Sequence, residues 1–510
     1  MTSAELGYAT PAEAAEKSPI QQFYADKCIF LTGATGFMGK VISEKLLRTC
    51  PDIRTIYILI RPKKGKEIST RFEEIFSDPV FAQLQETRPD FAKCIVPVAG
   101  DVAQKGLGLS DEDRETLLEN VNIVFHAAAT VRFDEKLRLA NAINVQGTRD
   151  MLALCAQMQN LKCVIHVSTA YSNCNLQEIQ EKFYQPPIGH ESLSKCVDSL
   201  EDNILDAATP AILQDFPNTY AFTKNVAEDV VRDLGKDLPI AVYRPAIIIA
   251  TWKEPVSGWI DNVYGPTGVV VGAGLGILRT LHANKEMVAD LVPVDMAVSA
   301  LIATAYETAI STRKPDEEIP IYNYVSSPEK PITWGEFMEL NYRNGVNVPS
   351  IKAIWYYTLT INKYRPLHLL CSLFLHFLPA LLVDGVLVAI GRSPQMMKVY
   401  KKIHRFGDVI AYFSTQQWNF TNNNMQALWK KLNTKDQQLF NFSMSNMDWE
   451  DYFRTHILGL RRFLAKDDPS TLPAARKRWF KFLVLHRCIQ GVAVYVALRI
   501  IWSLLCYMFF

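Results

Sequence analysis

The sequence predicts an α/β protein whose core is a doubly wound parallel sheet, followed by a mainly helical C-terminal region and a C-terminal membrane helix. Three observations lead to this fold class. Short apolar runs alternate with helical patterns through the first half of the chain, a glycine-rich turn joins the first apolar run to a helix, and the final residues form one long apolar stretch. Strands that alternate with helices are typical of a parallel sheet covered on both faces.

Six apolar runs are predicted to be strands of this sheet. They are Cys28–Leu31, Ile56–Ile60, Cys94–Ala99, Ile123–His126, Lys162–Val167 and Ile240–Tyr243. His126 and His166 lie inside two of these runs, and we expect them to be core residues.

The first run is followed by Thr32-Gly33-Ala34-Thr35-Gly36-Phe37-Met38-Gly39 and then by a helical pattern from Lys40 to Arg48. Glycines at this position let the backbone turn tightly and approach a pyrophosphate, which the N-terminal end of the helix then binds. The GxxGxxG spacing, between a strand and a helix, therefore predicts a dinucleotide site. Its expected cofactor contacts are Thr32, Gly33, Thr35, Gly36, Phe37 and Gly39.

The second run is followed by Arg61 and then by Pro62, Lys63 and Lys64. An acidic residue at this point binds the ribose 2′-hydroxyl of NAD, whereas an arginine accommodates the 2′-phosphate of NADP. Arg61 therefore predicts NADPH rather than NADH, and the alternative is a solvated basic turn. Two later strand ends complete the expected cofactor site, because Asp101 with Val102 can reach the adenine and Ala127 leaves room for the cofactor.

The fifth run leads into Ser168 and Thr169, and a helical pattern downstream contains Tyr220 and Lys224. Residues spaced i, i+4 share one face of a helix. An ammonium near a phenol favours the phenolate, so we expect Lys224 to lower the pKa of Tyr220. Tyr220 can then give a proton to the oxygen of a carbonyl under reduction. Thr169, or Ser168 beside it, can donate a hydrogen bond to the same oxygen.

These motifs resemble the extended short-chain dehydrogenase/reductases, which are built on a Rossmann sheet. Asn144-Val145-Gln146-Gly147-Thr148 and Tyr243-Arg244-Pro245 fit this resemblance, which places Asn144 and Pro245 at the cofactor. More narrowly, the chain is similar to the fatty acyl-CoA reductases of animals. The stretches that carry this similarity are Glu254–Asn262, Gly265–Gly268, Asp290–Met296, Ser326–Trp334, Met447–Trp449 and Gly459–Arg461.

The resemblance implies an enzyme that reduces a long-chain acyl-CoA with NADPH, through an aldehyde, to a primary fatty alcohol and free CoA. In this scheme Tyr220 protonates the oxygen, Thr169 stabilises it, and Lys224 also holds the ribose. Two other interpretations remain: a membrane-bound sterol or steroid dehydrogenase on the same fold, and a membrane-anchored scaffold without catalytic activity.

The composition excludes several classes of function. Lys plus Arg number 54 and Asp plus Glu 53, which does not favour a nucleic-acid binder. Ten cysteines occur without a CxxC pair, so we expect no metal site, no disulfide framework and a reducing compartment. The N-terminal residues lack the basic and apolar regions of a secretory signal.

The stretch from Cys488 to Phe510 is apolar with one charge, Arg499, and it follows Arg476, Lys477, Arg478 and Lys481. It is long enough to cross a bilayer, and the basic flank should stay in the cytosol with the catalytic domain. Because Arg499 is costly inside a membrane, an interfacial helix is the alternative. A second apolar stretch, Leu367–Ile390, contains Asp384 and two histidines. It predicts a buried helical hairpin, a re-entrant segment or a membrane-docking surface; we favour docking over a full crossing, and a core helix of a soluble protein is the equal alternative.

The expected organisation has five parts. Residues 1–26 form a disordered lead-in, 27–250 the NADPH-binding domain, 251–350 a substrate-side lobe, 351–466 a helical domain, and 467–510 a basic linker with the membrane segment. The expected partners are a long-chain acyl-CoA and a lipid bilayer. Among membranes we favour the endoplasmic reticulum, with the peroxisome and the lipid droplet as alternatives.

Overall fold

The computed structural model describes residues 17–62, 65, 67–314 and 316–509, and it divides the chain into two compact units. The first unit contains the segment that ends at Ser257 together with Asp290–Pro331 and Trp418–Met447. The second contains Gly258–Ala289, Ile332–Gln417 and the segment that starts at Asp448. Each unit is therefore assembled from three separate stretches of the sequence.

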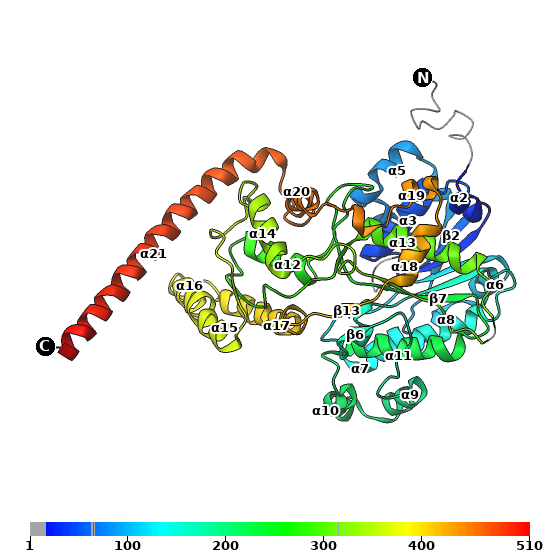
Figure 1. Ribbon diagram of the computed structural model, residues 1–510, viewed down its shortest axis with the longest axis horizontal. Coiled ribbons are helices and arrows are strands. Elements are labelled where there is room, and N and C mark those ends of the chain that lie inside the picture. Colours follow the sequence, from blue (N-terminus) through cyan, green and yellow to red (C-terminus); the bar gives the residue numbers. More distant parts are fainter. Residues whose placement is uncertain (1–16, 63–64, 66, 315, 510) are drawn as a thin grey trace, which may run out of the picture. The chain divides into compact units, whose positions relative to one another are not determined.

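A seven-stranded parallel sheet forms the centre of the first unit, which confirms the predicted fold class (Figure 1). Its strands, in spatial order, are β11 (Ile321–Tyr324), β7 (Ile240–Pro245), β5 (Cys163–Val167), β4 (Ile123–His126), β1 (Cys28–Thr32), β2 (Thr55–Ile60) and β3 (Ile95–Ala99). The order of the strands reverses at β1, which pairs with β2 on one side and with β4 on the other. Ligands of such sheets bind at the carboxyl ends of the strands beside this reversal.

Helices cover both faces of the sheet, so the central strands are buried at every position. α3 (Phe37–Thr49) and α13 (Val294–Ile310) pack together on one face, and α8 (Gly147–Cys155) and α11 (Thr219–Leu234) on the other. The remaining helices of this unit are α2 (Pro19–Tyr24), α4 (Ile68–Phe76), α5 (Ala82–Thr87), α6 (Asp111–Asn120), α7 (Leu137–Ala140), α9 (His190–Ser199), α10 (Asp202–Leu213), α18 (Asn423–Lys431) and α19 (Thr434–Leu439).

The structure corrects the sequence-based prediction in two parts of this unit. Residues 1–16 of the lead-in expected over residues 1–26 lie outside the described residues, and its last part instead contains α2, which begins at Pro19 with a capping box at Ser18. Ile20 and Tyr24 are fully buried, and the Tyr24 hydroxyl donates to the Ile302 carbonyl at 3.0 Å. In the sheet, β11 adds a seventh strand that the sequence did not predict.

Residues expected to form a substrate-side lobe over 251–350 are instead divided between the two units. Within the first unit, β10 (Leu291–Pro293) pairs in parallel with β8 (Ile247–Ile249) and leads directly into α13. A further small parallel pair joins β6 (Glu178–Ile179) to β13 (Asn419–Phe420).

The second unit is mainly helical, in agreement with the expectation for the C-terminal region. Its helices are α12 (Gly265–Gly274), α14 (Trp334–Gly345), α15 (Arg365–Ser372), α16 (Leu378–Ala389), α17 (Met396–Ser414), α20 (Trp449–Gly459) and α21 (Leu472–Phe509), beside one parallel pair of β9 (Thr280–His282) with β12 (Thr360–Asn362).

Two helical stretches of the second unit are long and apolar enough to cross a membrane. Within the most apolar window of Arg365–Ala389, 22% of the residues are buried in the protein, whereas none are buried in that of Pro469–Met508. The exposed apolar surface of α21 suggests membrane anchoring.

Candidate active site

The glycine loop lies at the carboxyl end of β1, where the sequence predicted it. Gly33 has a φ of +77°, and a Cβ on it would come within 2.9 Å of the backbone of Ala127 and Ala128. A Cβ on Gly39 would overlap the carbonyl oxygen of Gly33. Glycine is therefore required at both positions, because any side chain would push β1, β4 and α3 apart.

The loop ends at Gly36, from which α3 begins. In the described part of the chain no side chain caps this helix, and its first turn holds no acidic residue. Its N–H groups and the positive end of its dipole thus remain suited to an anion. Thr35 and Phe37 flank this point and are half-buried. The donor set fits the pyrophosphate of a dinucleotide.

Arg61 follows the carboxyl end of β2 and is exposed to solvent. Its carbonyl oxygen accepts a hydrogen bond from the side chain of Arg71, so two guanidinium groups belong to this edge of the sheet. Lys63 and Lys64 lie outside the described residues.

The ends of β3 and β4 bring together the other predicted cofactor contacts. The carboxylate of Asp101 accepts from the N–H of Ala103 at 3.0 Å, which shapes the turn after β3. Val102 packs against the start of α8, since a Cβ on Gly147 would lie 2.7 Å from its carbonyl oxygen. Ala127, directly after β4, is half-buried.

Thr32 and Asn144 are buried and hold this region together. Thr32 Oγ1 lies 3.0 Å from Nδ1 of His126 and accepts from the N–H of Ala128 at 3.1 Å. The amide of Asn144 donates to Thr223 Oγ1 at 2.9 Å and accepts from the N–H of Thr130 at 3.0 Å. Both side chains thus have protein partners, and their contribution to a cofactor site is to fix its walls.

Tyr220 and Lys224 lie on α11, as their spacing predicted. Asn218 caps this helix by accepting from the N–H of Ala221 at 2.9 Å. The Lys224 ammonium donates to the carbonyl of Val167, the last residue of β5, at 2.8 Å. Thr169 follows β5 by two residues, and its hydroxyl lowers the pKa of the Tyr220 phenol. α11 therefore brings Tyr220, the predicted proton donor, and Lys224 to the carboxyl end of β5.

The sequence predicted that Lys224 lowers the pKa of Tyr220, and the structure does not show this effect. Burial raises the pKa of the Tyr220 phenol to about 12, and the hydroxyl of Thr169 lowers it by less than burial raises it. Burial also lowers the pKa of Lys224 to about 8, against an opposing effect of Glu228. The correction has a physical reason: a low dielectric disfavours both charged forms, and the lysine is turned towards the Val167 carbonyl.

Ser168 has a different environment from Thr169, although both were predicted at the reacting oxygen. Its hydroxyl donates to the carboxylate of Glu228 at 2.5 Å, and that of Ser172 donates to the same oxygen at 2.9 Å. Thr169 instead contacts Tyr220. The alternation of side chains along the strand end separates the two residues, with Thr169 at the phenol and Ser168 at the carboxylate.

The sequence analysis missed the buried ion pair between Glu228 and Arg244. Arg244 donates to Glu228 through Nε at 2.9 Å and Nη2 at 2.6 Å, and the side chains are 0% and 2% exposed. Tyr220, Lys224 and Glu228 follow one another at i, i+4 and i+8 on a single face of α11. Glu228 lies four residues after Lys224, and this repeat of the i, i+4 spacing was the signal that could have revealed its role.

The acids of Asp290–Met296, one of the stretches that carried the family resemblance, have a structural role. The carboxylate of Asp295 accepts from the N–H groups of Trp252 at 2.8 Å, Lys253 at 2.9 Å and Glu254 at 3.1 Å. The carboxylate of Asp290 accepts from the N–H of Ser327 at 2.8 Å. Both acids fix loops near the sheet, and burial raises the pKa of both.

Comparison with known proteins places this site in a family. A family model described as male sterility protein matches residues 31–301, and a second model of the same description matches residues 375–467. The chain is 46% identical over 490 residues to the fatty acyl-CoA reductase wat of Drosophila melanogaster, which covers 96% of this chain and 93% of that protein. It is 37% identical over 494 residues to human fatty acyl-CoA reductase 1, with coverage of 94% and 93%.

Solved structures agree in fold. The reductase domain of a nonribosomal peptide synthetase from Mycobacterium tuberculosis has a TM-score of 0.56 at 19% identity, covering 88% of this chain and 93% of that one. The terminal R domain of the myxalamid biosynthetic pathway has a TM-score of 0.54 at 20% identity, covering 86% and 90%. At these identities the likeness concerns the fold alone.

Proposed function

The chain belongs to the fatty acyl-CoA reductases, and we propose that it reduces a long-chain fatty acyl-CoA to the primary fatty alcohol with NADPH as reductant. The observation that carries the proposal is the grouping of Tyr220, Thr169 and Lys224 at the carboxyl end of β5. This grouping lies on the sheet edge to which the glycine loop also belongs.

NADPH, when bound, supplies a hydride to the carbonyl carbon, first of the thioester and then of the aldehyde. The protein must therefore stabilise negative charge on the carbonyl oxygen and provide one proton in each step. Thr169 donates a hydrogen bond to that oxygen, and Tyr220 delivers the proton. After the first reduction the C–S bond breaks, which releases the CoA thiol and leaves the aldehyde for the second.

The raised pKa of Tyr220 suits this role in the free protein. A phenol with a pKa of about 12 is protonated at neutral pH, so Tyr220 enters each cycle as an acid. Lys224 positions the helix through its bond to Val167 and supplies a positive charge next to the cofactor ribose. Ser168 is bound to Glu228 and supports the site without touching substrate.

An activity assay tests the function. Membranes that contain the full-length protein are incubated with palmitoyl-CoA and NADPH, and both NADPH consumption and hexadecanol are measured. We expect two NADPH per alcohol. One NADPH with accumulation of aldehyde would refute the second step, and turnover of sterols alone would refute the substrate.

The choice of NADPH over NADH depends on Arg61, with support from Arg71. Replacement of Arg61 by Asp removes a positive charge and adds a negative one where the 2′-phosphate would lie. We expect kcat/KM for NADPH to fall by roughly 100-fold while that for NADH is retained or rises. Lys93→Asp is the matched control, because Lys93 is exposed at the opposite, amino end of the sheet. Equal losses with both cofactors would contradict the assignment.

We also propose that α21 anchors the protein in the endoplasmic reticulum membrane with the catalytic unit in the cytosol. The helix is exposed and apolar, and Arg476, Lys477, Arg478 and Lys481 precede its apolar part. In sealed microsomes a C-terminal tag should be protected from protease while Rossmann-domain epitopes are digested. A digested C-terminal tag would refute the crossing, and imaging against peroxisome and lipid-droplet markers tests the organelle.

A further inference from the structure

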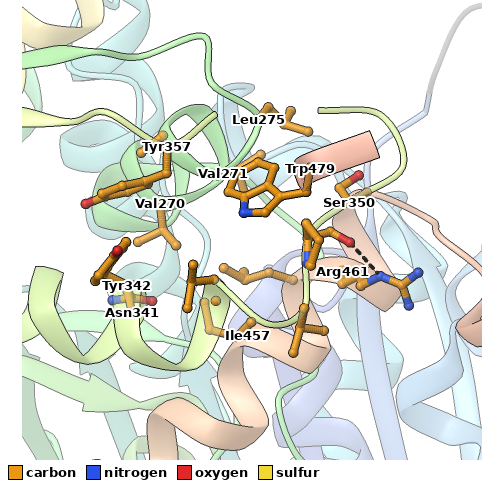
Figure 2. A pocket seen from close by; sticks show the side chains of 18 of the residues that line it. Val270, Val271, Leu275, Asn341, Tyr342, Ser350, Tyr357, Ile457, Arg461 and Trp479 are labelled. Atoms are coloured by element: carbon orange, nitrogen blue, oxygen red, sulfur yellow. Dashed lines mark hydrogen bonds between the residues drawn. The ribbon is translucent and has the colours of Figure 1, made fainter. Parts of the chain in front are cut away.

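The second unit contains a cavity of its own. It contains about 690 Å³ of empty space, which includes open solvent at its mouth. Its walls come from α12, α14, the segment 346–350, Tyr357, α20 and the first part of α21 (Figure 2).

The walls of this cavity are apolar. Val270 and Val271 of α12, Met338 of α14, and Ile457 and Leu460 of the α20 region line it. Arg461 is the one charged residue among those that line it. The guanidinium of Arg461 is already bound, because it donates to the carbonyl of Pro349 at 3.3 Å and to Thr471 Oγ1 at 2.6 Å. The cavity thus offers no free charge to a phosphate or a nucleotide.

Two buried polar atoms of the lining residues have no hydrogen-bond partner. They are the indole Nε1 of Trp479, a donor, and the amide Oδ1 of Asn341, an acceptor. Trp479 is 8% exposed and Asn341 is 4% exposed, and the indole nitrogen points into the cavity (Figure 2). Orphaned polar atoms in an apolar cavity are costly unless a ligand pairs with them.

Trp479 also links the cavity to the exposed apolar surface of α21. The next residue, Phe480, is 64% exposed, and the helix continues with exposed apolar residues such as Val484 and Ile489. Trp479 thus lies in α21 directly before its exposed apolar surface.

We propose that this cavity binds one long alkyl chain whose polar end pairs with Trp479. The hydrocarbon accounts for the apolar walls, and a hydroxyl or carbonyl accounts for the unpartnered indole N–H. A hydroxyl can in addition donate to an amide oxygen such as that of Asn341. The inference rests on the proposed function for its source of ligand, which is the fatty alcohol.

Gly274 provides a way to fill the cavity. It lines the wall at the end of α12, and a Cβ added to it would have nothing within 4 Å. Gly274→Phe therefore places a ring in the cavity without a backbone clash. Gly407→Phe is the matched control, because a Cβ on Gly407 also meets nothing within 4 Å and Gly407 belongs to α17 of the same unit, outside the lining residues.

The direct test is photolabelling of the detergent-solubilised full-length protein with a hexadecanol that carries a diazirine. We expect labelled peptides from α12 and α20, and at least a tenfold loss of labelling in Gly274→Phe but not in Gly407→Phe. Absence of labelling at these helices, or equal labelling in both variants, would overturn the proposal. Because this readout does not require turnover, it can succeed or fail independently of the reductase activity.

Chain-length profiles distinguish a separate alcohol site from the binding site of the acyl substrate. If the cavity holds the alcohol, labelling is lost in Gly274→Phe while the acyl-CoA profile is unchanged. A shift of the preferred acyl-CoA to shorter chains, by about fourfold in affinity for each methylene displaced, would overturn the proposal. Trp479→Phe tests the polar end, since it removes the N–H and should weaken hexadecanol binding by roughly tenfold while sparing hexadecane.

Discussion

Replacement of Glu228 by Ala should destabilise the first unit more than any exposed substitution. The carboxylate accepts four hydrogen bonds, two from Arg244 and one each from Ser168 and Ser172, between 2.5 and 2.9 Å. Arg244 would keep its bonds to the carbonyls of Gln180 and Lys182 but would remain buried without a counter-ion. Breaking a buried pair in this way costs about 3–5 kcal/mol of the free energy of unfolding. Glu228→Gln retains the shape and one carbonyl acceptor, so it should cost less.

Thermal unfolding of the detergent-solubilised protein measures this loss. Cys28, Cys155 and Cys163 are buried in the first unit, so a thiol-reactive fluorescent dye reports its opening. We expect the transition to fall most in Glu228→Ala, less in Glu228→Gln, and not at all in Glu191→Gln, which changes an exposed acid on α9. Equal transitions for Glu228→Ala and Glu191→Gln would refute the reasoning.

The same substitution has a second consequence at Lys224. Glu228 raises the pKa of Lys224 against the lowering by burial, which leaves it at about 8. Without the carboxylate, the pKa of Lys224 should fall further, and the ammonium would lose its proton at lower pH. We therefore expect the alkaline limb of the pH–rate profile of Glu228→Gln to move to lower pH. An unshifted limb would show that Lys224 is not electrostatically linked to Glu228.

Three further predictions concern the cofactor loop and the proton donor. Tyr220→Phe should lower kcat by at least about 100-fold at unchanged protein level, because it removes the proton donor, and activity assays on matched membrane preparations check this. Gly33→Ala should weaken binding of the dinucleotide and lower thermal stability, since its Cβ would lie 2.9 Å from the backbone of Ala127; a variant that binds NADPH normally would contradict this. Burial lowers the pKa of His126 to about 3, so the unfolded state takes up a proton below about pH 6.5 and the folded state does not. Stability should then be lost as the pH falls from about 6.5 towards 3, by about 1.4 kcal/mol per pH unit from this residue, and the pH slope should flatten in His126→Asn.

The central strands and the catalytic helix could be predicted because their signals are local. β1 is a short apolar run that ends in glycines, and α11 places Tyr220 and Lys224 one turn apart. β11 was missed because Ile321-Tyr322-Asn323-Tyr324 contains a buried polar residue, Asn323, whose amide donates to Thr421 at 2.8 Å. That partner lies far along the chain, so no local pattern could reveal why an asparagine is buried there.

In the active site too, the roles of residues depend on partners that lie far away in the sequence. The roles of Ser168 and Thr169 differ only because Glu228 lies behind one of them and Tyr220 beside the other. The direction of the Tyr220 pKa depended on burial, which the residue types alone do not give. The cavity of the second unit is built from helices between α12 and α21, and it had no recognisable motif.

The chain passes back and forth between its two units, which affects how the protein is synthesised and whether a unit can be expressed alone. The first unit is complete only when the segment Trp418–Met447 is in place, because α18 packs on β11 and α13. The growing polypeptide must therefore be synthesised to residue 447 before all contacts of the first unit can form. Neither unit can be expressed as one continuous fragment, and a chimera with a relative must exchange three segments to exchange one unit.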